Sequence, residues 1–155
     1  MARFRRFRRS YGAKGRRNAE RIVRAGTSDV TNATQQTAYT YTAPTACVVK
    51  SIKLDMGMTT GAAYFSMPYV LVVVREGYDA NTINYPAITD DLYNPTADVL
   101  ISGVLTDGAV EDHKFNMIGR KLKRGDRICL IVRGSGAGGG DQGRVVFEMN
   151  FSVLT

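Results

Sequence analysis

The first 25 residues concentrate the groups that could bind a polyanion. They carry ten Lys or Arg side chains against one acid, Glu20, whereas the rest of the chain holds 11 basic and 13 acidic residues. Nine of the ten cations are arginines, and one planar guanidinium group can donate hydrogen bonds to two oxygens of the same phosphate. A basic segment on a slightly acidic body separates two tasks, because the segment neutralises a polyanion while the body does something else. The predicted nucleic-acid-binding cations are Arg3, Arg5, Arg6, Arg8, Arg9, Lys14, Arg16, Arg17, Arg21 and Arg24.

Three aromatic residues, Phe4, Phe7 and Tyr11, are interleaved with these cations. Unpaired bases stack on such rings for roughly 1–3 kcal/mol per base, so the pattern favours single-stranded nucleic acid as the partner. The same cations also fit a nuclear-localisation signal. No apolar stripe lies opposite the basic residues, as a membrane-surface helix requires, so we expect no membrane partner. We predict that residues 1–28 are a disordered arm, with a helical turn within residues 18–25.

Catalytic and metal-binding groups are sparse. The single histidine, His113, follows Glu111 and Asp112 in a stretch that resembles a turn, where a lone histidine is usually a solvated surface group. Neither this acidic pair nor the pair Asp90 and Asp91 has the spacing of a calcium loop. We therefore predict no catalytic residue, no metal, no cofactor and no small-molecule substrate, which means that the chain is not an enzyme.

The segment Gly134–Gly143 contains the pattern G-x-G-x-x-G after an apolar run. A dinucleotide site needs a helix next, so that the helix N-terminus faces the pyrophosphate, but the residues that follow are typical of a strand. We expect a flexible hairpin connection here. Two cysteines, Cys47 and Cys129, lie within apolar runs without metal-ligand spacing, which predicts buried free thiols and a reducing compartment at synthesis.

Short β-like segments and Gly-rich turns must position these groups. The 130 residues after the arm suffice for one domain, and they show no helical periodicity. Regular short strands without intervening helices indicate a β-sandwich or barrel. The apolar run at residues 69–74 is typical of a strand buried on both faces. The seven predicted strands span residues 37–42, 47–56, 69–75, 99–105, 114–118, 127–133 and 144–153.

A 22-residue loop, Gly77–Asp98, is longer than a compact domain usually holds without a use for it. Its tyrosines are poor choices for a solvated excursion, because exposed rings cost free energy that a partner surface recovers. We therefore predict that Tyr78, Tyr85 and Tyr93 contact a neighbouring subunit; alternatively, the loop is a folded part of the sandwich that hides an eighth strand.

The body has one basic cluster, Lys121, Lys123, Arg124 and Arg127. It is most simply a charged hairpin turn. Two other readings stay open: it is the binding face of a nucleic-acid-binding β-barrel, or it reinforces the inner surface of a shell.

The whole layout, the arm MARFRRFRRSYGAKGRR followed by a compact all-β domain, resembles the single jelly-roll capsid proteins of small icosahedral viruses. Among these it is most similar to those of circular Rep-encoding single-stranded DNA viruses, the circovirus-like group, with satellite plant RNA viruses as the nearest competitor. The resemblance implies an antiparallel jelly-roll sandwich of eight strands over residues 29–155, and an arm that lines the shell and binds the genome.

The function expected from this resemblance is that of a coat protein. Copies of the chain assemble into a small icosahedral shell, 60 in the smallest case, and package a single-stranded genome, with DNA favoured over RNA. The protein would then reside in the virion, and in the host nucleus during assembly. The alternative is a cellular nucleic-acid-binding β-barrel module that acts as a monomer or small oligomer.

Overall fold

The computed structural model describes residues 19–80, 97–115 and 120–154, which contain nine β-strands. No helix long and apolar enough to span a membrane occurs in these ranges. The strands are β1 (Ala19–Thr31), β2 (Gln35–Thr42), β3 (Cys47–Thr60), β4 (Ser66–Val74), β5 (Ala97–Thr106), β6 (Val110–Phe115), β7 (Arg120–Leu122), β8 (Arg127–Arg133) and β9 (Gln142–Leu154).

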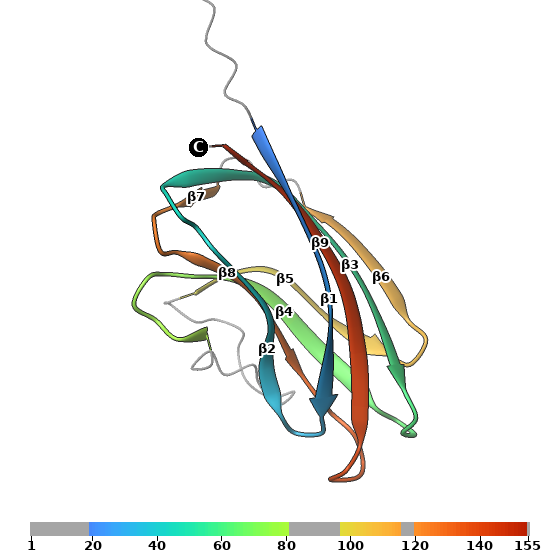
Figure 1. The fold of residues 1–155 in the computed structure, drawn as a ribbon. Helices are drawn as coiled ribbons and strands as arrows, with labels where there is room; N and C mark the ends of the chain where they lie inside the picture. The colour runs from blue at the N-terminus through green and yellow to red at the C-terminus, as the bar shows by residue number, and fades with distance from the viewer. Residues whose placement is uncertain (1–18, 81–96, 116–119, 155) are drawn as a thin grey trace, which may run out of the picture.

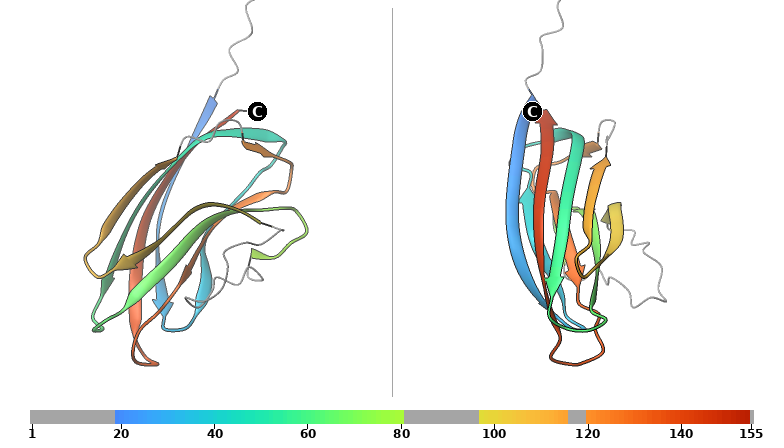
Figure 2. Two further views of the ribbon diagram at one scale, coloured as in Figure 1. Left: turned by 180° about the vertical axis from the view of Figure 1, so that it is seen from behind. Right: turned by 90° about the vertical axis from the view of Figure 1, so that its right-hand side faces the viewer.

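The strands form two antiparallel sheets that face each other (Figures 1 and 2). One sheet has the order β1-β9-β3-β6, and the other has the order β2-β8-β4-β5. β7 pairs with residues 47–49 of β3 and β6 with residues 52–57, so the two short strands share one position in the first sheet. Each sheet thus has four strand positions. The chain crosses from one sheet to the other at every connection except β4–β5 and β6–β7. This arrangement is a jelly roll. The predicted all-β jelly-roll sandwich is confirmed.

The main core lies between the two sheets. Every second side chain of β9, from Val145 to Val153, is buried, which is the alternation expected of a strand with one face on a core. Ring contacts join the sheets, with 6.0 Å between the ring centroids of Tyr39 and Phe147 and 4.8 Å between those of Tyr41 and Phe151. Such aromatic pairs add roughly 0.5–1.5 kcal/mol beyond the area that they bury.

β4 is buried on both faces, as its continuous apolar run predicts. All side chains from Tyr69 to Val74 are at most 1% exposed. One set faces the main core, and the other forms a second cluster on the outer face of the same sheet. Ala80, at the start of the long loop, belongs to this second cluster. The beginning of the loop therefore packs on its own subunit.

The predicted arm is too long at its C-terminal end. Residues 19–28 are not disordered, and residues 19–25 do not form the predicted helical turn, because β1 begins at Ala19 and pairs with β9 over 13 residues. Ile22 lies opposite Phe151, and Gly26 leaves room for the ring of Phe147, whose nearest atom would lie 2.8 Å from an added Cβ. β1 is an edge strand, so most of its side chains are exposed and its sequence lacks the alternation of apolar and polar residues that indicates a strand. Residues 1–18 lie outside the described ranges.

The glycine-rich segment is not a hairpin, because it joins β8 of one sheet to β9 of the other. Asn32 holds this connection to the β1–β2 turn: its Nδ2 donates to the carbonyl of Gly138, and its Oδ1 accepts from the amide of Gly136, both at 2.8 Å. The backbone amide of Asn32 also donates to the carbonyl of Asp141 at 2.8 Å. The G-x-G-x-x-G pattern is thus followed by a strand, as expected.

The turn between β3 and β4 contains a residue in an unfavourable conformation. Tyr64 has a φ of 60° and is 93% exposed. This left-handed region costs an ordinary L-residue roughly 1–2 kcal/mol, and glycine adopts it freely. We expect Tyr64→Gly to raise the free energy of unfolding by about 0.5–1 kcal/mol, measured by urea denaturation. The matched control is Ala63→Gly, in the same turn without a positive φ, which should lower stability. A loss on Tyr64→Gly would contradict this account.

Candidate nucleic-acid interface

β1 begins at the end of the sandwich where β9 ends. From here on, the arm means residues 1–18, which join the body at this end. Ala19 pairs with Leu154, Leu154 also pairs with Val48, and Val48 pairs with Lys121 on its other side. These four positions form one rung across the first sheet. Neighbouring strands lie about 4.8 Å apart, so three spacings put the backbone at Lys121 roughly 14 Å from the backbone at Ala19. We call this end of the molecule, with the β2–β3 and β7–β8 turns, the arm end (Figure 1).

A buried carboxylate organises the arm end. Asp126 is 1% exposed and lies in the turn before β8. One of its oxygens accepts hydrogen bonds from the backbone amide of Lys123 and from Nη1 of Arg75, both at 2.8 Å. The other accepts from the amide of Glu76 at 3.1 Å. The aspartate therefore ties the β7–β8 turn to the end of β4.

The ion pairs continue from Asp126 across the gap between the sheets. Arg75 also contacts Asp98 of β5 at 3.0 Å, and Asp98 contacts Arg120 of β7 at 2.7 Å. The chain of alternating charges joins β4 and β5 in one sheet to β7 in the other. The buried Nε of Arg120 is the single side-chain polar atom in the described part of the chain that is buried without a hydrogen-bond partner.

These contacts set the charge of Asp126. Burial alone raises the pKa of this carboxyl, but the amide of Lys123, the Arg75 guanidinium and the amide of Glu76 outweigh burial and hold the pKa below its usual value. Hydrogen bonds and a nearby cation favour the ionised form of a carboxyl group. Asp126 is therefore a charged group that the fold uses internally.

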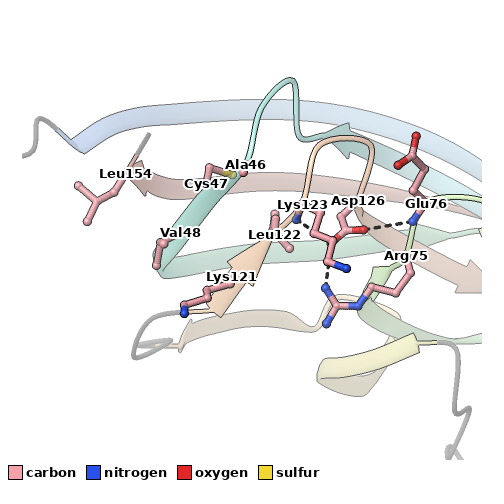
Figure 3. A pocket seen from close by; sticks show the side chains of 10 residues that line it. All are labelled: Ala46, Cys47, Val48, Arg75, Glu76, Lys121, Leu122, Lys123, Asp126 and Leu154. Atoms are coloured by element: carbon pink, nitrogen blue, oxygen red, sulfur yellow. Dashed lines mark hydrogen bonds and ion pairs between the residues drawn. The ribbon is translucent and has the colours of Figure 1, made fainter.

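A hollow of about 1070 Å³ opens at the arm end (Figure 3). Its floor is apolar and includes Val48, Leu122 and Leu154, while Lys121 and Lys123 supply positive charge from β7 and the following turn. Neither lysine side chain makes an ion pair or hydrogen bond in the described parts of the chain. Of the cluster Lys121, Lys123, Arg124 and Arg127, the two lysines thus line a cavity near the start of β1. The turn that carries them is not the predicted hairpin, because it joins β7 of one sheet to β8 of the other.

The predicted nucleic-acid residues fall into two groups. Arg21 and Arg24 lie in the edge strand β1, where Nε of Arg21 donates to Oδ1 of Asn150 at 2.9 Å and Nη1 of Arg24 to the carbonyl of Val23 at 2.9 Å. The other eight cations and the three aromatic residues, Phe4, Phe7 and Tyr11, lie outside the described residues.

Of the three tyrosines predicted at an interface, the structure describes one. Tyr78 is 50% exposed, and its carbonyl oxygen accepts a hydrogen bond from the Arg127 guanidinium. Tyr85 and Tyr93 lie outside the described residues, so their contact with a neighbouring subunit stays a prediction.

Of the groups judged unsuitable for catalysis, Glu111 and Asp112 make contacts with other strands that the structure describes. Glu111 accepts a hydrogen bond from the hydroxyl of Tyr69, and Asp112 pairs with Lys53 at 3.6 Å. His113 lies in β6 opposite Leu54, and Asp90 and Asp91 fall outside the described ranges. Within those ranges, no three His, Cys, Asp or Glu residues gather where they could hold a metal ion.

Both cysteines are buried free thiols, as expected. Burial raises the pKa of each thiol, which disfavours the reactive thiolate.

Sequence reasoning missed the Asp126 network, although it placed a turn at Arg124, Gly125 and Asp126. An aspartate at the end of a turn, just before an apolar strand, commonly accepts backbone amides, and this was the available signal. Its partners Arg75 and Asp98 are distant in sequence, so the ion pairs could not be read from spacing.

Comparison with known proteins gives a limited result. No family model and no curated protein matches the chain. Two solved structures of infectious bursal disease virus resemble it: the Gt strain, with 13% identity over 87% of this chain and a TM-score of 0.41, and the Gx strain, with 14% identity over 89% and a TM-score of 0.42. This chain spans about a third of the length of either, 32%. At this similarity they carry no argument about function, and the jelly-roll assignment rests on the strand order.

Replacing Asp126 tests whether the buried carboxylate holds the arm end together. Asp126→Asn should lower the free energy of unfolding by about 3 kcal/mol at pH 7, since it leaves Arg75 without its buried partner. The folded pKa lies below the unfolded value of about 3.9, so the stability that this charge supplies is complete above pH 4 and is lost as the pH falls through the folded pKa. The difference between wild type and variant should therefore shrink in urea denaturation at pH 3.

The matched control is Asp29→Asn, which removes an exposed carboxylate that pairs with Arg144 at 2.7 Å. We expect a much smaller loss, because exposed ion pairs contribute little. Equal losses in the two variants, or a difference for Asp126→Asn that is the same at pH 7 and pH 3, would contradict the assignment.

Proposed function

We propose that this chain is a viral capsid protein, in which the jelly roll forms the wall of a closed shell and the basic arm binds a packaged single-stranded genome. The observation that carries the proposal is the attachment of an arginine-rich arm to the edge strand of a jelly roll, at an end that also bears unpaired lysines. The jelly roll is a common architecture of capsid domains, although it also serves lectins and cupins. The arm distinguishes the capsid function from these.

Electrostatics couples the two tasks. Arms of high positive charge repel one another when many copies gather, unless a polyanion cancels the charge. Binding of nucleic acid by the arms therefore favours assembly of the bodies. In the smallest icosahedral shell, the positive charge of 60 arms would match the phosphate charge of a cargo on the order of 10³ nucleotides. The proposal includes DNA as the favoured cargo and the host nucleus as the place of assembly, where the arm would act as a localisation signal.

The contacts between subunits include the long loop. Tyr78 exposes half of its surface, and tyrosine is enriched at the centres of interfaces. We propose that Tyr78, Tyr85 and Tyr93 contact a neighbouring copy. The alternative of a monomeric nucleic-acid-binding barrel loses its structural basis, because the strands form two separate four-position sheets rather than a five-stranded barrel.

Deleting residues 2–17 tests the role of the arm. The deletion removes eight cations and no acid, and it stops before β1, so the sandwich should fold with an unchanged melting temperature. We expect the ratio of absorbance at 260 nm to that at 280 nm of the purified protein to fall to the value of protein alone.

A charge-preserving variant provides the control. Lysine in place of the seven arginines in this segment keeps the positive charge, so most of the bound nucleic acid should remain. If the deletion variant retains its full nucleic-acid content, the arm does not bind the cargo.

A further inference from the structure

The hollow at the arm end carries positive charge that neighbouring acids leave free. Lys121 precedes Leu122, which is 2% exposed, so the alternation of β7 turns Lys121 to the side away from the core, and Lys123 is exposed just after the strand. Arg124 follows in the exposed turn. Two or three cations thus face solvent at one edge of the hollow.

Asp126, one of the two acids that line the hollow, is engaged in the ion-pair network. Asp126 satisfies Arg75 and two backbone amides, and Asp98 satisfies Arg75 and Arg120. Glu76 also lines the hollow, but Figure 3 shows its carboxylate turned away from the Arg75 guanidinium. The ion-pair network therefore neutralises the two arginines and leaves the two lysines available to an external anion.

We propose that this hollow is a second binding site for nucleic acid, carried by the folded body, in which Lys121 and Lys123 bind backbone phosphates of a single strand. The inference rests on the proposed function, because it takes the same cargo as the arm. It adds a contact that does not depend on the arm, and it assigns a ligand to two members of a cluster for which the sequence left a turn and a binding surface both open.

The chemistry of the lining favours phosphate over bases. Lysine ammonium groups act as point charges that meet phosphate oxygens in many geometries. No aromatic side chain occurs among the residues that line the hollow, so bases have no ring on which to stack. The site should therefore bind nucleic acid without sequence preference.

The position of the hollow supports the same ligand. Ala19 and Lys121 belong to one rung of the sheet, so the residues that precede β1 join the body roughly 14 Å from the backbone of Lys121. Tethering of this kind raises the effective concentration of phosphate at the hollow.

The test measures the salt dependence of binding with the full-length protein after nuclease treatment. The probe is a fluorescent oligothymidine strand, titrated across a series of NaCl concentrations. Each phosphate contact to a single strand contributes about 0.7 to the slope of log K against log salt. For the double variant Lys121→Ala, Lys123→Ala we expect the slope to fall in magnitude by about 1.4, with no change between homopolymers of different base.

The matched control is Lys53→Ala, Arg144→Ala, which removes the same net charge from cations that pair with Asp55 and Asp29 away from the arm end. Its slope should stay close to wild type, and Lys121→Arg, Lys123→Arg should restore the wild-type slope. Equal slopes in the hollow variant, the control and wild type, with binding retained, would overturn the hollow site and leave the arm in place. Absence of binding by wild type would overturn the proposed function together with the site.

Discussion

The register of β9 fixes the relation between the two basic parts of the molecule. β9 is central in its sheet, with β1 on one side and β3 on the other. Its buried side chains point into the sandwich, and slipping either neighbour by one residue would turn that neighbour's apolar side chains to the solvent. β1 therefore has to begin opposite Leu154, and β3 has to bring β7 to the same end. The arm and the lysines of the hollow share one end because packing in the core requires it.

The charged residues at that end form two sets, one that pairs within the fold and one that faces solvent. Asp126, Arg75, Asp98 and Arg120 neutralise one another and hold β4, β5 and β7 together. Asp126 is the buried member of this network, so removing its charge costs more than a surface ion pair contributes. Lys121 and Lys123 contribute nothing comparable to folding. Their free charge adds to that of the arm, whereas exposed pairs elsewhere, such as Asp29 with Arg144, compensate each other.

Features set by neighbouring residues could be predicted from the sequence, whereas features set by contacts between distant segments could not. The apolar run Tyr69–Val74 and the alternation in β9 are local patterns, and both gave the correct strands. β1 was missed because an edge strand of the sequence AERIVRAGTSDVT exposes most of its side chains, so its identity as a strand comes from pairing with β9, over a hundred residues away. The hollow was missed for the same reason: the lysines were visible as a cluster, but their position beside Ala19 follows only from the sheet order. The arm's role, in contrast, was inferred from charge alone.

The central claim, that the body assembles and the arm carries the cargo, is tested most directly by electron microscopy of the purified full-length protein in negative stain. The account predicts uniform closed particles that contain nucleic acid and break down when the cargo is removed at high salt. Dispersed subunits of 17.0 kDa at low salt and high protein concentration would contradict it.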